Sequence, residues 1–264
     1  MSDKERPFNQ PESLIGKAVF AFLDWMEARI RTHSRVGATA FFDEGHFPWL
    51  GELKSEWQAV RAEAEAVLPI RDRLPAFQDI SNEVGYISKD DQWKTFMLLG
   101  YGIRSERNLA LCPATARALR HIPDLRTAFF SILEPGKRLP PHRGPYNGVL
   151  RLHLGLIVPE QADHCWIRVE HERRIWQPGE ALIFDDALEH EVHNDTDEVR
   201  VVLFVDFLRP CRWPINWLNR LLVFAARFSP AVQSARKNQA RWEKSFYALK
   251  AAGHASRSDR NPPR

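Results

Sequence analysis

The chain has 264 residues, of which 44% are hydrophobic, so it is long enough for one sizeable globular domain with additional elements, or for two small ones. Its three cysteines are too few and odd in number for a disulfide framework, and no apolar stretch is long enough to span a bilayer. We therefore expect a cytoplasmic protein without a signal peptide or a membrane span.

Charge is distributed unevenly along the chain. Residues 209–264 contain twelve Lys/Arg and two Asp/Glu, a balance of +10, whereas residues 1–208 carry 25 basic and 32 acidic residues, a balance of −7. This asymmetry indicates either an anionic partner for the basic segment or only a solvated basic helix and tail. As the anionic partner we expect peripheral contact with a membrane surface and no nucleic acid.

Helical patterns dominate the first part of the chain. Residues 12–33 form a predicted amphipathic helix, and residues 52–68 form a second helix rich in Ala and Glu. Residues 94–99 are a candidate strand, and residues 113–121 predict a helix with proline at its first position. We interpret residues 1–125 as a helical flank that packs on the core.

From about residue 126 the pattern changes to short apolar runs separated by turn signals. Runs at this spacing favour an antiparallel sandwich or barrel, which we place at residues 126–210. The predicted strands are residues 127–133, 149–158, 165–169, 181–184, 190–194 and 198–207.

Helical periodicity returns after Pro210. Residues 211–250 predict basic amphipathic helices, and residues 251–264 predict a disordered tail. The first helix either covers the outer face of the barrel, where Val201 and its neighbours need cover, or lies in a membrane interface. Its apolar stripe consists of Trp217, Leu218, Leu221, Leu222, Ala225 and Phe228.

Polar residues interrupt two of the predicted strands. Arg151 and His153 share one face of the strand at 149–158, which an ordinary sheet would expose to water. Arg200 enters a strand that is apolar on both faces, so it needs an anionic partner. A small dicarboxylate suits its forked geometry, and a protein carboxylate such as Asp206 is the alternative.

Two histidines stand at strand ends, each with an Arg further along the chain. Neutral imidazoles at His142 and His190 would suit Fe(II), and a jelly-roll barrel brings distant strand ends together. The alternative is that they are ordinary surface or structural residues among the ten histidines of the chain.

Three segments resemble the core signature of the aspartyl/asparaginyl β-hydroxylases. They are residues 142–156 (HRGPYNGVLRLHLGL), 176–192 (WQPGEALIFDDALEHEV) and 200–206 (RVVLFVD), and the resemblance covers residues 126–210. It implies a mainly β fold with flanking helices around a double-stranded β-helix core of the jelly-roll, cupin-like type. It also implies an Fe(II)- and 2-oxoglutarate-dependent dioxygenase that hydroxylates an unactivated C–H bond and releases succinate.

The resemblance assigns roles to seven residues. His142 and His190 would be the metal ligands. The residues of the 2-oxoglutarate pocket would be Ser131, Leu133, Arg151, His153 and Arg200.

Gly144 occupies the position where most enzymes of this class carry a carboxylate ligand, two residues after the first histidine. Eukaryotic members of the resembled family also have glycine there and leave that coordination position to water. Iron halogenases leave the same position to chloride, but the flanking motif here follows the hydroxylases. Asp185 and Asp186 are an alternative source of the ligand, although paired aspartates before a strand more often form a turn.

Two substrate classes follow from the resemblance. We expect a peptidyl Asp or Asn side chain, with the acyl chain of a membrane lipid, as in the lipid A and ornithine-lipid hydroxylases, as the alternative. The segments 47–50 (FPWL) and 57–64 (WQAVRAEA) look similar to the lipid hydroxylases. A non-enzymatic, cupin-like ligand binder is a third reading, and the oligomeric state stays open.

Overall fold

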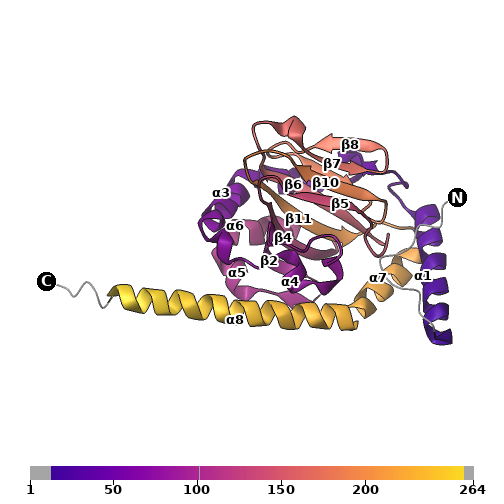
Figure 1. The fold of residues 1–264 in the computed structure, drawn as a ribbon. Helices are drawn as coiled ribbons and strands as arrows, with labels where there is room; N and C mark the ends of the chain where they lie inside the picture. Colours follow the sequence, from indigo (N-terminus) through magenta and orange to yellow (C-terminus); the bar gives the residue numbers. More distant parts are fainter. Residues whose placement is uncertain (1–12, 101, 259–264) are drawn as a thin grey trace.

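Two antiparallel sheets form the centre of the molecule, which a computed structural model describes over residues 13–100 and 102–258 (Figure 1). The larger sheet contains, in spatial order, β1 (Phe41–Phe42), β9 (Ala181–Phe184), β6 (Val149–Ile157), β11 (Arg200–Leu208), β4 (Leu125–Leu133), β2 (Trp93–Gly100) and β3 (Ile103–Arg104). The smaller sheet contains β5 (Arg138–His142), β10 (His190–Asn194), β7 (Cys165–Val169) and β8 (Glu172–Ile175).

The strand order identifies the barrel. From β4 to β11 the chain crosses repeatedly between the sheets and leaves the orders β4-β11-β6-β9 and β5-β10-β7-β8. This is a jelly roll, so the predicted double-stranded β-helix is confirmed.

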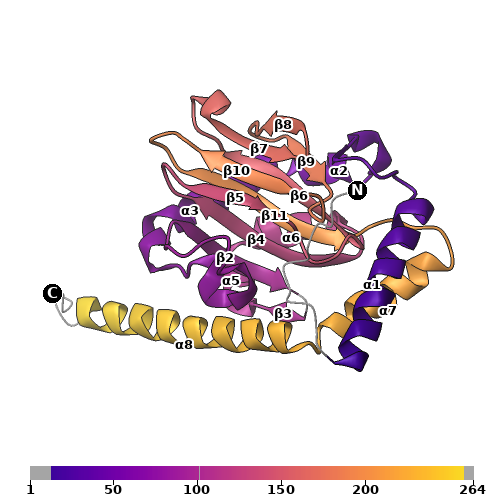
Figure 2. The same ribbon diagram turned by 45° about the vertical axis from the view of Figure 1, so that its right-hand side comes forward.

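Helices surround the barrel on one side and at one end (Figures 1 and 2). The α-helices are α1 (Leu14–His33), α2 (Leu50–Ser55), α3 (Trp57–Val67), α4 (Phe77–Ile80), α5 (Glu106–Leu111), α6 (Pro113–Ala118), α7 (Ile215–Ala226) and α8 (Pro230–Ser258). Short 3-10 helices are η1 (Glu44–His46), η2 (Leu68–Arg73), η3 (Asn82–Val84), η4 (Leu119–His121) and η5 (Ala162–His164). Among the helices that the structure describes, none is both long and apolar enough to cross a bilayer.

Strand β11 is buried on both faces, as its sequence predicts. Val201 and Leu203 pack in one apolar cluster with Val60 of α3, outside the barrel. Val202 and Phe204 point the other way, into the cluster between the two sheets. Because both faces lie in apolar surroundings, a polar side chain on the inner face of β11 loses water on folding.

The helical flank contributes strands as well as helices. β1, β2 and β3 precede residue 126 and belong to the larger sheet, so this sheet extends into the segment predicted as a helical flank. β2 pairs with β4 along its whole length. The apolar sequence of β2 alone does not show which strand it pairs with. The helix predicted at 52–68 is two helices that meet at Glu56.

The C-terminal helices also differ from expectation. α7 does not cover Val201 and Leu203, because its Leu218 and Leu222 pack on Met26 and Ile30 of α1. α8 continues to Ser258, although a disordered tail was predicted from residue 251. Residues 1–12 and 259–264, predicted as parts of the flank and the tail, lie outside the described residues.

Candidate functional site

His142 and His190 lie side by side on neighbouring strands. β5 and β10 pair so that these two residues are direct partners, and their ring centroids are 4.1 Å apart. Each Nδ1 bonds a backbone carbonyl, at 2.7 Å to Pro140 and 2.9 Å to Leu188. A carbonyl only accepts, so both Nδ1 atoms carry the proton and both Nε2 lone pairs are available.

Burial keeps both rings neutral. It lowers the pKa of His142 to about 4 and that of His190 well below its usual value. Neutral imidazoles with Nδ1 held by a carbonyl are the form in which histidine ligates a metal. Within residues 13–100 and 102–258, no group of three or more His, Cys, Asp or Glu side chains is arranged to hold a metal ion. The donor set therefore suits a metal with two protein ligands and open positions.

The Asp186 side chain fills the space beside Gly144. A Cβ at position 144 would overlap the Asp186 carboxylate, and the Gly144 N–H donates to the Asp186 carbonyl at 2.7 Å. Asp186 also pairs with Arg151 at 2.9 Å, and burial raises its pKa to about 7. Asp185 turns away to pair with Arg209 at 2.9 Å. The two aspartates thus anchor the turn before β10 on different partners.

A second group of polar atoms is buried without partners between the sheets. Among the described residues, nothing bonds Nε and Nη1 of Arg200, either ring nitrogen of His153, or Nε1 of Trp176. The Arg200 guanidinium lies 4.6 Å from the Trp176 ring centre. Burial lowers the pKa of Arg200 to about 10 and raises that of the neighbouring Cys165 thiol, which leaves Arg200 without an anionic neighbour there.

Several side chains lie near the Arg200 guanidinium, where an anion would pair with it. Leu133 is the register partner of Arg200 on β4, and Ser131, two residues away on the same strand, accepts a bond from Trp93 at 3.0 Å. Phe184 contacts both His153, at 5.0 Å, and His190, at 5.9 Å, between ring centres. The barrel interior therefore brings the polar pocket next to the histidine pair.

Arg151 differs from the other predicted pocket residues. Its guanidinium pairs with Asp206 and Asp186, both at 2.9 Å, and lies over the Phe204 ring at 4.2 Å. Asp206, which the sequence offered as a partner for Arg200, thus belongs to Arg151. A role of Arg151 in holding 2-oxoglutarate stays a prediction, and it would require sharing the guanidinium with these carboxylates.

The model of the aspartyl/asparaginyl beta-hydroxylase family matches residues 54–210. The chain belongs to this family. It is 49% identical over 242 residues to the ornithine lipid ester-linked acyl 2-hydroxylase of Rhizobium tropici. This match covers 92% of this chain and 86% of that protein. It is 32% identical over 173 residues to the aspartyl/asparaginyl beta-hydroxylase of Homo sapiens. This match covers 64% of this chain and 22% of that protein.

Solved structures similar to this hydroxylase include a Cupin 2 conserved barrel domain protein from Salinispora arenicola. It is 11% identical, covers 52% of this chain and 89% of that chain, and has a TM-score of 0.31. TT1209 from Thermus thermophilus is 18% identical, covers 44% of this chain and 86% of that chain, and has a TM-score of 0.29. These scores are low, so the fold assignment depends on the strand order above.

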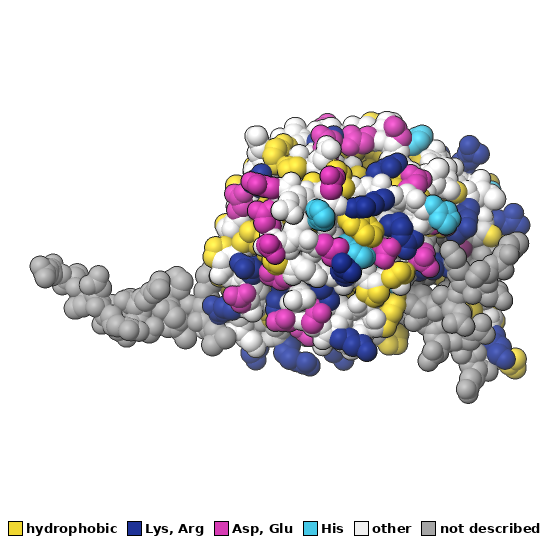
Figure 3. All heavy atoms as spheres, turned by 45° about the horizontal axis from the view of Figure 1, so that its top comes forward, with side chains coloured by type: hydrophobic (Ala, Val, Ile, Leu, Met, Phe, Trp, Pro, Cys, Tyr) yellow, Lys and Arg dark blue, Asp and Glu magenta, His cyan; other side chains and the backbone are white. Residues whose placement is uncertain are grey.

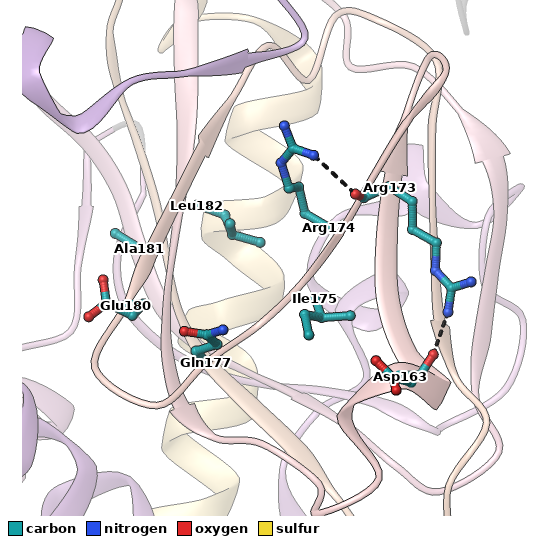
Figure 4. Close-up of a pocket in the computed structure, with 8 residues that line it drawn as sticks. All are labelled: Asp163, Arg173, Arg174, Ile175, Gln177, Glu180, Ala181 and Leu182. Atoms are coloured by element: carbon teal, nitrogen blue, oxygen red, sulfur yellow. Dashed lines mark hydrogen bonds between the residues drawn. The ribbon is translucent and has the colours of Figure 1, made fainter.

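An open groove of about 630 Å³ lies between β8 and β9 of the hydroxylase, near the buried polar group of Arg200, His153 and Trp176. Figure 4 shows Leu182 and Ile175 along it, with Arg173 and Arg174 on β8. Leu182 is the register partner of His153, so the groove borders the strand pair that carries the pocket. It does not include the two histidines.

Sequence reasoning missed Trp176 and Trp93 as site residues. Trp176 has 1% of its surface exposed, and its indole N–H has no hydrogen-bond partner among the described residues. Trp93 donates to the Ser131 hydroxyl and so orients it. The signal for Trp176 was its place at the start of the segment 176–192. Trp93 gave no such signal, because it lies outside the three segments.

Proposed function

We propose that this hydroxylase uses Fe(II) and 2-oxoglutarate and hydroxylates the acyl chain of a membrane lipid. The observation that carries the cofactor assignment is the presence in one barrel of two neutral histidines and of the buried Arg200, which has no carboxylate partner among the described residues. A buried guanidinium without an acceptor is costly, and a dicarboxylate would supply the missing anion.

Each residue group has a separate task in this proposal. Nε2 of His142 and of His190 would hold the metal, with Nδ1 fixed by Pro140 and Leu188. Arg200 and His153 would receive the far carboxylate of 2-oxoglutarate. When bound, iron and 2-oxoglutarate would supply the activation of dioxygen, which is the oxidant: one oxygen atom would enter the C–H bond and the other the succinate, with carbon dioxide released from 2-oxoglutarate. The apolar wall around the pocket keeps water out.

The lipid substrate is favoured by the extent of the likeness to the R. tropici protein. That protein's name states an acyl chain of ornithine lipid, and the match includes 92% of this chain. The peptidyl Asp/Asn substrate, our first expectation, is supported by a human relative of which this chain spans 22%. We therefore place the lipid acyl chain first and keep the peptidyl side chain as the second candidate.

Succinate release tests the cofactors and product analysis tests the substrate. The protein is incubated with Fe(II), 2-oxoglutarate and either total lipid extract or a peptide library. We expect succinate and a hydroxylated lipid, and loss of both in His142→Ala and His190→Ala. His164→Ala, at an exposed histidine, serves as the matched control and should keep full turnover.

Each result separates one alternative. Full succinate production in either ligand variant would remove the iron assignment. Hydroxylated Asp or Asn in the peptides, with unchanged lipid, would select the peptidyl substrate. No succinate with either pool, together with retained 2-oxoglutarate binding, would favour the ligand-binder reading.

A further inference from the structure

Helix α7 carries an apolar stripe that faces solvent. Trp217, Leu221, Phe224 and Phe228 recur at helical spacing on one face and leave 50–67% of their surface exposed. The opposite face of α7 is buried, with Ile215 among the buried residues. Of the six residues of the apolar stripe expected from the sequence, Leu218 and Leu222 thus pack inward and the other four are exposed.

Helix α1 extends this exposed surface. Figures 1 and 2 show α1 and α7 side by side at one end of the barrel. Phe22 and Trp25 of α1 stack at 5.9 Å and are each more than 40% exposed, at 46% and 44%. The two helices share a buried seam and each presents aromatic side chains to solvent. We name these exposed apolar side chains, with Phe228 just after the end of α7, the α1–α7 face: Leu14, Phe22, Trp25, Trp217, Leu221, Phe224 and Phe228.

Basic side chains accompany this face. Arg227 lies over the rings of Phe224 and Phe228, at 5.2 and 5.6 Å, and Arg29 lies over Trp25 at 5.6 Å. Residues 209–242 contain no Asp or Glu. On the barrel face drawn in Figure 3, by contrast, basic and acidic side chains are intermixed. Exposed aromatic rings bordered by arginine are suited to the headgroup region of a bilayer with anionic lipids.

The face is connected to the metal-site histidines through one loop. Asn219 of α7 donates to the carbonyl of Gly148 at 2.7 Å and accepts from the Tyr146 hydroxyl at 3.0 Å. Asn147 donates to the carbonyl of Glu27 on α1 at 3.1 Å. Both helices therefore hold the loop that leads out of β5 from His142, α7 through Asn219 on its buried side and α1 through its backbone.

We propose that the α1–α7 face docks on an anionic lipid bilayer and brings the hydroxylase to a lipid substrate in the membrane. This inference rests on the proposed function, since it names the surface from which the lipid would be taken. Trp242 of α8 does not add to this face, because it packs inward and donates to the carbonyl of Arg73 at 3.1 Å.

Vesicle sedimentation of the full chain tests the docking without any turnover. Vesicles of phosphatidylcholine with one quarter phosphatidylglycerol are compared with pure phosphatidylcholine. We expect binding to the anionic vesicles, weakened by salt. The variant Trp217→Ala/Phe224→Ala should bind at least about tenfold more weakly, because two rings no longer enter the interface. Leu111→Ala, at an exposed leucine of α5, is the matched control and should bind like the parent chain.

Activity on two presentations of the lipid separates this inference from the proposed function. The double variant should keep its rate on lipid dispersed in detergent and lose it on vesicles. No hydroxylation of lipid in either form by the parent chain would refute the proposed function, while vesicle binding would still decide the docking. Undiminished binding of the double variant overturns the docking, as does absence of binding at low salt. The docking would also be overturned if the parent chain were a dimer and the double variant a monomer, because the face would then be the contact with a second copy.

Discussion

Arg200 and Arg209 are two buried arginines of the same segment with opposite surroundings. Arg209 pairs with Asp185 at 2.9 Å, and both side chains are almost completely buried. Two guanidinium nitrogens of each arginine lack a hydrogen-bond partner among the described residues, but Arg200 also lacks a carboxylate partner there, and burial lowers the pKa of Arg200 to about 10. An isolated buried charge costs stability, whereas a paired one is costly only when its partner is removed. The two positions therefore respond differently to the same substitution.

Arg200→Met should impair 2-oxoglutarate binding without unfolding the protein. Loss of one partner of a buried charge pair costs about 2–5 kcal/mol, so we expect the KM for 2-oxoglutarate to rise roughly 30-fold or more. The unliganded protein should unfold at the same temperature or higher, since a desolvated charge has been removed. Succinate kinetics and thermal unfolding measure the two effects.

Arg209→Met is the matched control for this prediction. It leaves Asp185 buried without its cation and should destabilise the fold by about 3–5 kcal/mol. A large loss of stability in Arg200→Met, with an unchanged 2-oxoglutarate requirement, would show that Arg200 is structural.

Gly144→Asp should weaken metal binding rather than complete a three-ligand site. The new side chain would overlap the Asp186 carboxylate, which is held by Arg151. Overpacking of this kind costs about 1–3 kcal/mol, and like charges add to the cost. Calorimetric titration with Co(II) and thermal unfolding measure the outcome.

The double variant Gly144→Asp/Asp186→Ala restores the space beside position 144. It should recover part of the stability lost by Gly144→Asp, because residues in contact have non-additive effects. Tighter metal binding together with faster turnover in Gly144→Asp alone would contradict the steric argument.

At the scale of elements, the flank is fastened to itself and to the barrel by specific polar contacts. Glu63 of α3 accepts from the backbone N–H groups of Ala114 and Thr115, at 2.6 and 2.8 Å, and from the Thr115 hydroxyl at 2.6 Å. These donors belong to the first turn of α6, where backbone N–H groups have no partner within the helix. A glutamate of one helix thus caps another.

Glu63→Ala should lower the free energy of unfolding by about 1–3 kcal/mol, because it leaves partly buried donors without an acceptor. Glu63→Gln keeps one acceptor oxygen and should fall between. Denaturant unfolding followed by tryptophan fluorescence measures the change. Glu65→Ala, which removes a surface pair with Arg61, should stay within about 0.5 kcal/mol of the parent. Equal losses at both positions would show that the cap contributes nothing specific.

Two elements were missed for identifiable reasons. β5 reads Arg-Leu-Pro-Pro-His, and prolines argue against a strand unless it lies at an edge, which is where β5 lies. β8 reads Glu-Arg-Arg-Ile at the opposite edge of the same sheet, without apolar alternation. Edge strands need only one bonded neighbour and little burial, so their sequences give a weak signal.

At the scale of the whole molecule, the two sheets supply different halves of the site. The smaller sheet carries His142 and His190, and the larger sheet carries His153 and Arg200. Neither sheet alone would supply both the histidine pair and the buried arginine that the proposed function requires. The barrel core, with Phe184 between His153 and His190, sets their separation.

Local pattern was sufficient for much of this protein. Alternation of apolar residues predicted β4, β6, β7, β9, β10 and β11, and helical periodicity predicted α1 and α7. The position of Arg200 in a doubly apolar strand was enough to expect burial and a need for an anion. These features depend on a residue and its near neighbours along the chain, so the sequence by itself determined them.

Tertiary structure decided what depends on distant partners. The pairing of Arg151 with Asp206 and Asp186 comes from the register of β6 with β11 and from the turn before β10. It leaves Arg200 without a carboxylate partner in the part of the chain that the structure describes. Which part of the apolar stripe faces outward was decided by α1, which covers Leu218 and Leu222 and leaves the rest exposed. Side-chain pairing and surface exposure are properties of elements brought together from across the chain, and local periodicity carries no information about which elements meet.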